Sequence, residues 1–114
     1  MADSQRVNKV SKLIKEEFGR IILKEVDLPK GVLATITGVE TFPNLQKSRV
    51  FVSVAPREKT EEVLKILKRE IFSLQQNLNH KLRMRPVPKI EFFEDRKLEK
   101  GQEIERILDN LNQE

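Results

Sequence analysis

The sequence predicts an α+β domain in which helices cover one face of a three-stranded sheet. Two long stretches repeat apolar residues at steps of three and four, the period of an amphipathic helix. Three short stretches are rich in the β-branched and aromatic residues typical of strands. The order is helix, strand, strand, helix, strand, and 114 residues suffice for one domain with one modest core.

The first helix is predicted over residues 6–25. Its apolar stripe consists of Val7, Val10, Leu13, Ile14, Phe18, Ile21 and Ile22. Charged side chains occupy the rest of its surface, as in a helix packed on one side. Pro29 and Gly31 mark the turn that follows this helix.

Two strands are predicted next, over residues 32–41 and 48–54. Alternation in the first strand places Leu33, Thr35, Thr37 and Val39 on one face, and Ala34, Ile36 and Gly38 on the other. In the second strand, Val50, Val52 and Val54 share one face. The short connection containing Pro43 and Asn44 favours an antiparallel hairpin.

A long helix is predicted from Thr60, which is a candidate N-cap. Its apolar stripe consists of Leu64, Leu67, Ile71, Leu74, Leu78 and Leu82. Because a helix of this length is unusual in so small a domain, we expect a kink or break within residues 69–77. A third strand follows over residues 90–94. A short peripheral helix over about residues 98–112 is expected outside a core of about residues 6–95.

The composition argues against several functions. The absence of cysteine excludes disulfides and thiolate chemistry. The chain has a lone histidine, His80, and no phosphate-binding glycine loop, so we expect no enzyme activity, no metal, no cofactor and no small-molecule substrate. No stretch reads as a signal peptide or a membrane span. A cytoplasmic monomer is the expectation.

Charge is distributed unevenly along the chain. Residues 1–89 contain 18 Lys and Arg against 10 Asp and Glu, whereas residues 90–114 contain 4 against 8. A basic body followed by an acidic tail is consistent with a polyanionic partner such as RNA. The alternative is an ordinary solvated charged surface.

The connection between the long helix and the third strand is the strongest candidate for RNA binding. The candidate residues are Lys81, Arg83, Arg85 and Lys89 in this connection, with Lys47 and Arg49 at the start of the second strand. Arg83 and Arg85 could instead form salt bridges with acidic residues at positions 91–95. Aromatic residues are few. Phe51 and Phe93 could lie on an open sheet face, but we expect both to pack in the core.

Three segments resemble the bacterial ribosome-binding factor A family. They are R-V-N-K-V-S-K-L-I-K-E-E near the N-terminus, A-T-I-T-G-V-E-T-F-P-N-L-Q-K-S-R-V-F-V-S-V in the strand pair, and K-L-R-M-R-P-V-P-K-I-E-F-F-E-D before and within the third strand. The third segment is the most specific, through Leu82, Arg83, Arg85, Val87, Pro88, Ile90, Phe92 and Asp95. The resemblance runs over about residues 6–112.

The resemblance implies a KH-like domain of type II topology that is not an enzyme. It implies binding to the small (30S) ribosomal subunit and its 16S rRNA, and assistance in late maturation, including processing of the 5′ region of that RNA. The family usually has an Ala-x-Gly kink between its central helices, but residues 69–72 of this chain read R-E-I-F. The kink could therefore be shallower, be shifted toward residues 75–79, or be absent.

A protein-interaction module is the competing hypothesis. An open sheet face or sheet edge would then bind a protein partner without direct RNA contact. The two hypotheses differ in salt dependence, because phosphate contacts weaken steeply as salt is added.

Overall fold

The computed structural model of the protein describes residues 2–96, with side-chain environments from residue 5 onward. The helix predicted over residues 98–112 lies outside the described residues. The elements are α1 (Ala2–Glu25), β1 (Leu33–Thr41), β2 (Lys47–Ala55), the short 3-10 helix η1 (Arg57–Lys59), α2 (Thr60–Arg69), α3 (Ile71–Lys81) and β3 (Lys89–Glu94).

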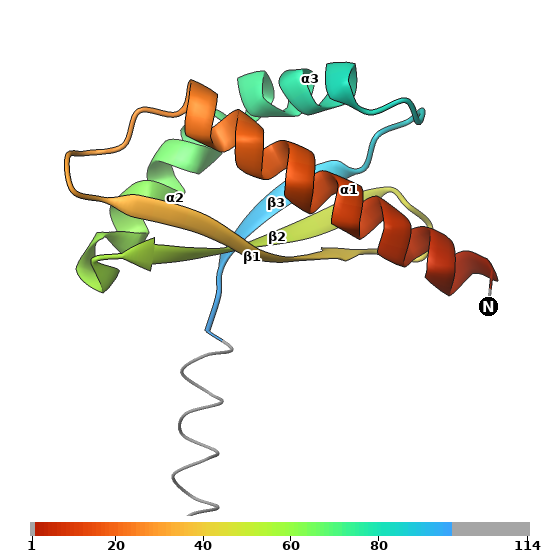
Figure 1. The fold of residues 1–114 in the computed structure, drawn as a ribbon, viewed down its shortest axis with the longest axis horizontal. Helices are drawn as coiled ribbons and strands as arrows, with labels where there is room; N and C mark the ends of the chain where they lie inside the picture. The colour runs from red at the N-terminus through yellow and green to blue at the C-terminus, as the bar shows by residue number, and fades with distance from the viewer. Residues whose placement is uncertain (1, 97–114) are drawn as a thin grey trace, which may run out of the picture.

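The described strands form one sheet in the order β1-β2-β3. β1 and β2 pair antiparallel as a hairpin, and β3 joins β2 in parallel after the crossover through α2 and α3. The three α-helices lie on one face of this sheet, and no described element covers the opposite face (Figure 1). The predicted α+β class, order of elements along the chain and one-sided helical layer are therefore confirmed.

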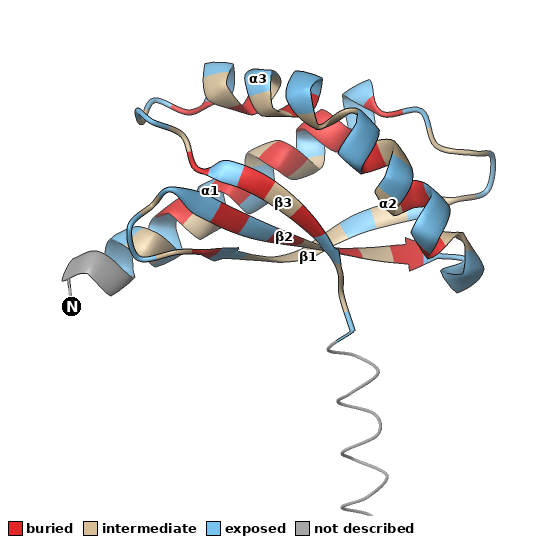
Figure 2. Ribbon diagram, turned by 180° about the vertical axis from the view of Figure 1, so that it is seen from behind, coloured by how far each residue is buried: buried red, intermediate tan, exposed pale blue. Residues whose placement is uncertain are grey.

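The core lies between the helices and the sheet, where the buried segments of both face each other (Figure 2). Its fully buried side chains include Ile14, Phe18, Val50, Val52, Val63, Leu67, Leu74 and Leu78. The rings of Phe18 and Phe92 lie 5.5 Å apart and join α1 to β3. Leu13 is 48% exposed, so its predicted place on the buried stripe of α1 is wrong. The buried side of α1, which packs against β1 and α3, is therefore narrower than the predicted apolar stripe.

The long helix is broken at Glu70, at the start of the range where a break is predicted. Glu70 has φ −89° and ψ 3°, outside the helical region, and it separates α2 from α3. Its own N–H donates to the Ile66 carbonyl at 3.0 Å, and its carbonyl accepts from the Leu74 N–H at 3.0 Å. The break lets α2 pack on β2 and β3 while α3 turns toward α1.

The start of α2 differs from the prediction. Lys59 occupies the N-cap position and makes no side-chain capping bond, whereas Thr60 is the first helical residue. The Thr60 hydroxyl donates to the Arg57 carbonyl at 2.6 Å. Thr60 cannot serve as the cap because η1 has already turned the chain into a helical path before α2 begins.

A β-bulge reverses the alternation of side chains along β1. The register with β2 shifts between Ile36 and Gly38, which leaves Thr37 without a partner residue of its own. One extra residue moves every following side chain to the opposite face. Val39 therefore pairs with a buried valine of β2 and faces the helices, so its predicted grouping with Leu33 is wrong.

Three hydroxyl groups connect α1 to the end of the hairpin. Ser11 donates to the Thr41 hydroxyl at 2.8 Å, and Thr41 and Ser48 share a hydrogen bond of 2.8 Å. Thr41 and Ser48 are buried, and burying a hydroxyl is costly unless it is hydrogen-bonded. This chain of bonds satisfies both groups and positions the hairpin end beside α1.

We predict that Leu78→Ala destabilises the protein by about 2–5 kcal/mol, because it removes a fully buried side chain and leaves a cavity. Leu23→Ala is the matched control, since Leu23 also lies on a helix but is 76% exposed. Its change in the free energy of unfolding should stay within about 0.5 kcal/mol. Urea denaturation followed by circular dichroism measures both values, and equal losses would contradict the assigned core.

Candidate nucleic-acid interface

The starts of β2 and β3 meet at one end of the molecule, and we call residues 46–47 and 88–90 together the strand junction. The Lys89 N–H donates to the Gln46 carbonyl at 2.9 Å. Parallel pairing then places Lys47 beside Lys89 and Arg49 beside Glu91. Residues that lie far apart in the chain are thus brought together.

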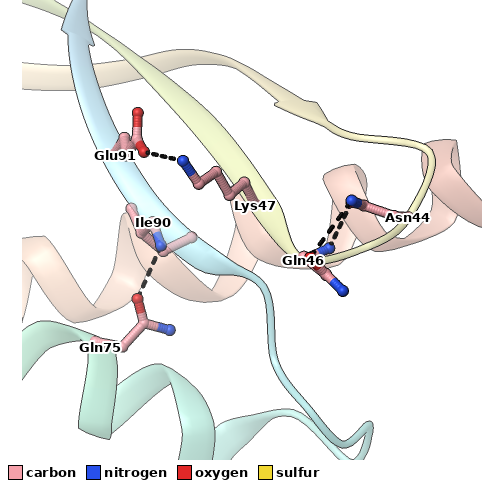
Figure 3. Close-up of polar contacts among 6 residues, drawn as sticks. All are labelled: Asn44, Gln46, Lys47, Gln75, Ile90 and Glu91. Carbon is pink, nitrogen blue, oxygen red and sulfur yellow. Dashed lines mark hydrogen bonds and ion pairs between the residues drawn. The ribbon is translucent and has the colours of Figure 1, made fainter.

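The side-chain amide of Gln75 holds the strand junction to α3 (Figure 3). Its oxygen accepts from the Ile90 N–H at 2.9 Å, and its nitrogen donates to the Pro88 carbonyl at 3.0 Å. The same nitrogen lies 3.1 Å from the Asn79 side-chain oxygen. β3 is an edge strand, so backbone groups on its outer side have no neighbouring strand to pair with. The Ile90 N–H and the Pro88 carbonyl therefore depend on Gln75 for a partner. The sequence showed only a cluster of polar residues here.

The hairpin loop presents the other side of the junction. The Asn44 side-chain oxygen accepts from the Gln46 N–H at 3.0 Å, and the Phe42 N–H donates to the Lys47 carbonyl at 2.9 Å. Leu45 has a φ of 59°, in the left-handed region that most residues avoid. The loop is therefore a tight turn of defined shape, so the start of β2 has a fixed position.

The structure divides the candidate cations into two adjoining groups. Lys47, Arg49 and Lys89 project from the sheet face that no described helix covers, since the alternate residues of β2 and β3 are buried against the helices. Lys81 ends α3, and Arg83 and Arg85 follow it in the connection to β3. The two groups meet where this connection enters the strand junction.

Arg83 and Arg85 have different environments, and within the described residues neither forms an ion pair with the acidic residues at positions 91–95. The Arg85 guanidinium donates to the carbonyls of Leu82 and Met84 at 2.8 and 2.6 Å, so it holds the end of α3. Arg83 is exposed and makes no hydrogen bond or ion pair with any residue in the described part of the chain. Arg83 is thus available to a ligand, whereas Arg85 has a structural role.

The ion pair at the junction instead involves Lys47. Its ammonium group lies 3.3 Å from a Glu91 carboxylate oxygen, and both side chains are substantially exposed (Figure 3). An exposed pair of this kind adds little stability. Its effect is local, because it neutralises Lys47 and leaves Lys89 as the uncompensated cation of the strand junction among residues 2–96.

Phe51 and Phe93 lie on the open sheet face, so the expectation that both pack in the core is wrong. Phe92 takes the core position, and strand alternation then turns Phe93 outward, where it is 39% exposed. The Phe51 and Phe93 rings lie 6.1 Å apart. The guanidinium of Arg49 lies 5.0 Å from the Phe42 ring centroid and 5.7 Å from that of Phe93. Both distances fit cation–π contacts.

A groove of about 340 Å³ follows the outer edge of β3 beside the break between α2 and α3. Lys68, Ile71 and β3 residues from Lys89 to Phe93 line it. A second groove of about 540 Å³ lies between α1 and the β1 edge, and its lining includes Gly19, Leu23 and Leu33. Leu23 is 76% exposed and Leu33 is 58% exposed, so this second groove presents apolar side chains beside Lys12, Lys15 and Glu16.

Among residues 2–96, no cluster of three or more His, Asp or Glu could hold a metal ion. His80 is exposed in the last turn of α3. No helix in the same part of the chain has the length and hydrophobicity needed to cross a membrane.

Comparison with known proteins identifies the family. The sequence profile described as ribosome-binding factor A matches residues 6–108. The chain belongs to the ribosome-binding factor A family. It is 35% identical to ribosome-binding factor A of Synechocystis sp., over 99% of this chain and 87% of the relative, and 32% identical to that of Microcystis aeruginosa, over 97% and 89%.

Solved structures of the ribosome-binding factor A family have the same fold. The crystal structure of the Thermus thermophilus protein superposes with a TM-score of 0.68, at 24% identity, over 77% of this chain and 94% of that one. A homology model of the same relative, fitted into an electron-microscopy map of its 30S complex, gives a TM-score of 0.66 at 26% identity, over 75% and 91%. The fold is KH-like, of type II topology, as the sequence predicts.

We predict that Gln75→Ala destabilises this family member by about 1–3 kcal/mol, because it leaves the Ile90 N–H and the Pro88 carbonyl without their partner. Gln76→Ala is the matched control, since Gln76 is exposed and makes no hydrogen bond with a described residue. Urea denaturation gives the stability change. Hydrogen exchange should also become faster at the Ile90 amide, and unchanged exchange would rule out the proposed role.

We also predict that Arg85→Ala and Arg83→Ala differ in their effect on stability. Arg85→Ala should lower the free energy of unfolding by about 1 kcal/mol, because two carbonyl contacts at the end of α3 are lost. Arg83→Ala should change it by less than about 0.5 kcal/mol. Thermal and urea denaturation test both values. A larger loss for Arg83→Ala than for Arg85→Ala would reverse the assignment.

Proposed function

We propose that this protein binds the small ribosomal subunit and contacts its 16S rRNA as an assembly factor. The observation that carries the proposal is the family membership, together with a relative of known fold whose coordinates were fitted into a map of its 30S complex. On the same ground we propose a role in late maturation of the subunit, including processing of the 5′ region of 16S rRNA. The protein would act in the cytoplasm as a monomer, by binding, without catalysing a reaction.

The basic groups around the strand junction support direct contact with RNA. Lys81 ends α3, Arg83 follows in the connection, and Lys89 starts β3 between the two backbone groups that Gln75 bonds. Cations on a rigid element bind phosphates and fix orientation without reading base sequence. Double-stranded RNA is recognised mainly by its shape and by phosphate and ribose contacts, so the fold of the ribosomal RNA would supply the selectivity.

The groove along β3 extends this basic surface toward the helix break. Lys68 and Lys89 lie among its lining residues, on opposite elements, and an RNA backbone in the groove would pass between cations. Residues 69–72 at the break contain neither the Ala nor the Gly usual in the family, and the Glu70 carboxylate lies 3.8 Å from the Arg69 guanidinium. The break therefore adds no net positive charge, and we place the main phosphate contacts at the strand junction.

A second candidate function is protein binding at the groove between α1 and β1. The exposed leucines of this groove and the adjacent edge of β1 favour an extended apolar segment that adds a strand to the sheet. Binding of that kind would depend weakly on salt. It is compatible with ribosome binding, because a subunit surface contains both protein and RNA.

We predict that the double variant Arg83→Ala, Lys89→Ala binds small subunits more weakly and with less salt dependence than the intact protein. A plot of log affinity against log salt concentration has a negative slope. Losing two phosphate contacts should reduce the magnitude of this slope by about 2. Cosedimentation with immature and mature small subunits over a series of salt concentrations measures both effects.

The control is Lys30→Ala, which removes one exposed cation in the turn before β1, at the opposite end of that strand from the strand junction. Its affinity and salt slope should equal those of the intact protein. Failure of the intact protein to bind small subunits would sink the proposed function. Unchanged binding by the double variant would sink only the assignment of the phosphate contacts.

A further inference from the structure

The open sheet face contains an aromatic cluster that phosphate binding does not explain. It consists of Phe42, Arg49, Phe51 and Phe93, and we call it the aromatic platform. Its members come from three different segments, the hairpin loop, β2 and β3. Parallel pairing of Phe51 with Phe93 brings the two strand aromatics together, so the platform exists only in the folded chain.

The platform offers flat surfaces to a ligand. Phe93 is 39% exposed, and the Arg49 guanidinium lies within cation–π distance of both the Phe42 and the Phe93 ring. Gly38 is the β1 partner of Phe51, and a Cβ built at Gly38 would meet no atom within 4 Å. The absence of a side chain at that position leaves open space on the β1 side of the platform, which a planar group can enter.

The surrounding charges favour a nucleotide over an apolar protein segment. Lys89 starts β3 on the same face as Phe93, and its neighbour Lys47 is already paired with Glu91. Lys89 lies four residues, or about 13 Å, along the strand from the exposed Phe93, with the Lys47-paired Glu91 between them. An uncompensated ammonium group and an exposed ring on one face suit the phosphate and base of one strand of nucleic acid. Arginine guanidinium planes and aromatic rings are also the surfaces on which unpaired RNA bases stack.

We propose that the aromatic platform stacks an unpaired base of ribosomal RNA on Phe93 and Arg49, while Lys89 contacts the adjoining phosphate. This deepens the proposed function and rests on it, because the RNA partner is the same. The proposal adds recognition of a single-stranded segment to a surface that would otherwise bind phosphates alone. The open face of the sheet would thereby be a second contact surface beside the α3–β3 connection.

The chain contains no Trp and no Tyr, so a single introduced tryptophan reports its own surroundings. The test compares Phe93→Trp with Phe72→Trp, since Phe72 is also exposed, at 75%, but lies on α3 away from the sheet face. Each variant is titrated with a single-stranded oligoadenylate of about eight nucleotides, a length within the site size of small single-strand-binding folds. A duplex of the same length is titrated in parallel.

In the Phe93→Trp variant, we expect the single strand to quench the indole fluorescence saturably and the duplex to quench it much less. The indole of the Phe72→Trp variant should change little with either ligand, because it lies away from the platform. Equal quenching of the Phe93→Trp variant by single strand and duplex would overturn the proposal.

Two variants of the protein without tryptophan test the stacking itself. Phe93→Leu keeps an apolar side chain but removes the ring, and it should weaken single-strand binding about 5- to 150-fold. Its salt slope should remain that of the intact protein, because no phosphate contact is lost. Arg49→Lys keeps the charge, removes the planar group and should also weaken binding. Unchanged affinity of both variants would overturn the proposal.

Intact small subunits distinguish the remaining outcomes. If RNA causes no quenching in the Phe93→Trp variant but small subunits shift its emission to the blue, the proposal is overturned in favour of a protein contact. Cosedimentation of the intact protein with small subunits tests ribosome binding separately from base stacking on the platform. Retained cosedimentation together with failed stacking refutes the platform and leaves the ribosomal function standing.

Discussion

The hydrogen bonds of Gln75 are the constraint on which the candidate interface depends. The Gln75 side-chain amide, which belongs to α3, donates to the Pro88 carbonyl just before β3 and accepts from the Ile90 N–H within β3. The connection between α3 and β3 carries two prolines, so it cannot satisfy its own backbone groups by forming a helix. Because α3 holds the start of β3, and β3 in turn pairs with the start of β2, the cations of the interface share one rigid support.

The one-sided arrangement of helices explains the second surface. Within residues 2–96, α1, α2 and α3 all pack on the same face of the sheet, so the alternate side chains of β2 and β3 face outward. In this protein those side chains include three cations and two phenylalanines beside Ser53 and Glu91. Arg49 stabilises the exposed rings through its contacts with Phe42 and Phe93, which keeps the cluster ordered without burying it.

Packing, rather than a small residue, produces the break between α2 and α3. Glu70 is no better suited to a bend than its neighbours, and its backbone groups are both hydrogen-bonded across the break. The two halves have different partners, since α2 lies against the edge of the sheet and α3 against α1. A continuous helix could bury only one of these contacts, so the chain bends where the buried face changes direction.

The sequence by itself determined the elements, their order and most of the core. Apolar periodicity is set by local geometry, so it located the helices and strands within a few residues and identified the basic connection. The bulge at Thr37 and the exposure of Phe93 depend on pairing between distant strands, and no local pattern encodes the register. Tertiary structure alone decided that Arg85 holds the end of α3 while Arg83 stays available. It also gathered cations and aromatic rings from separate segments, because only sheet pairing and the bonds of Gln75 bring those segments together.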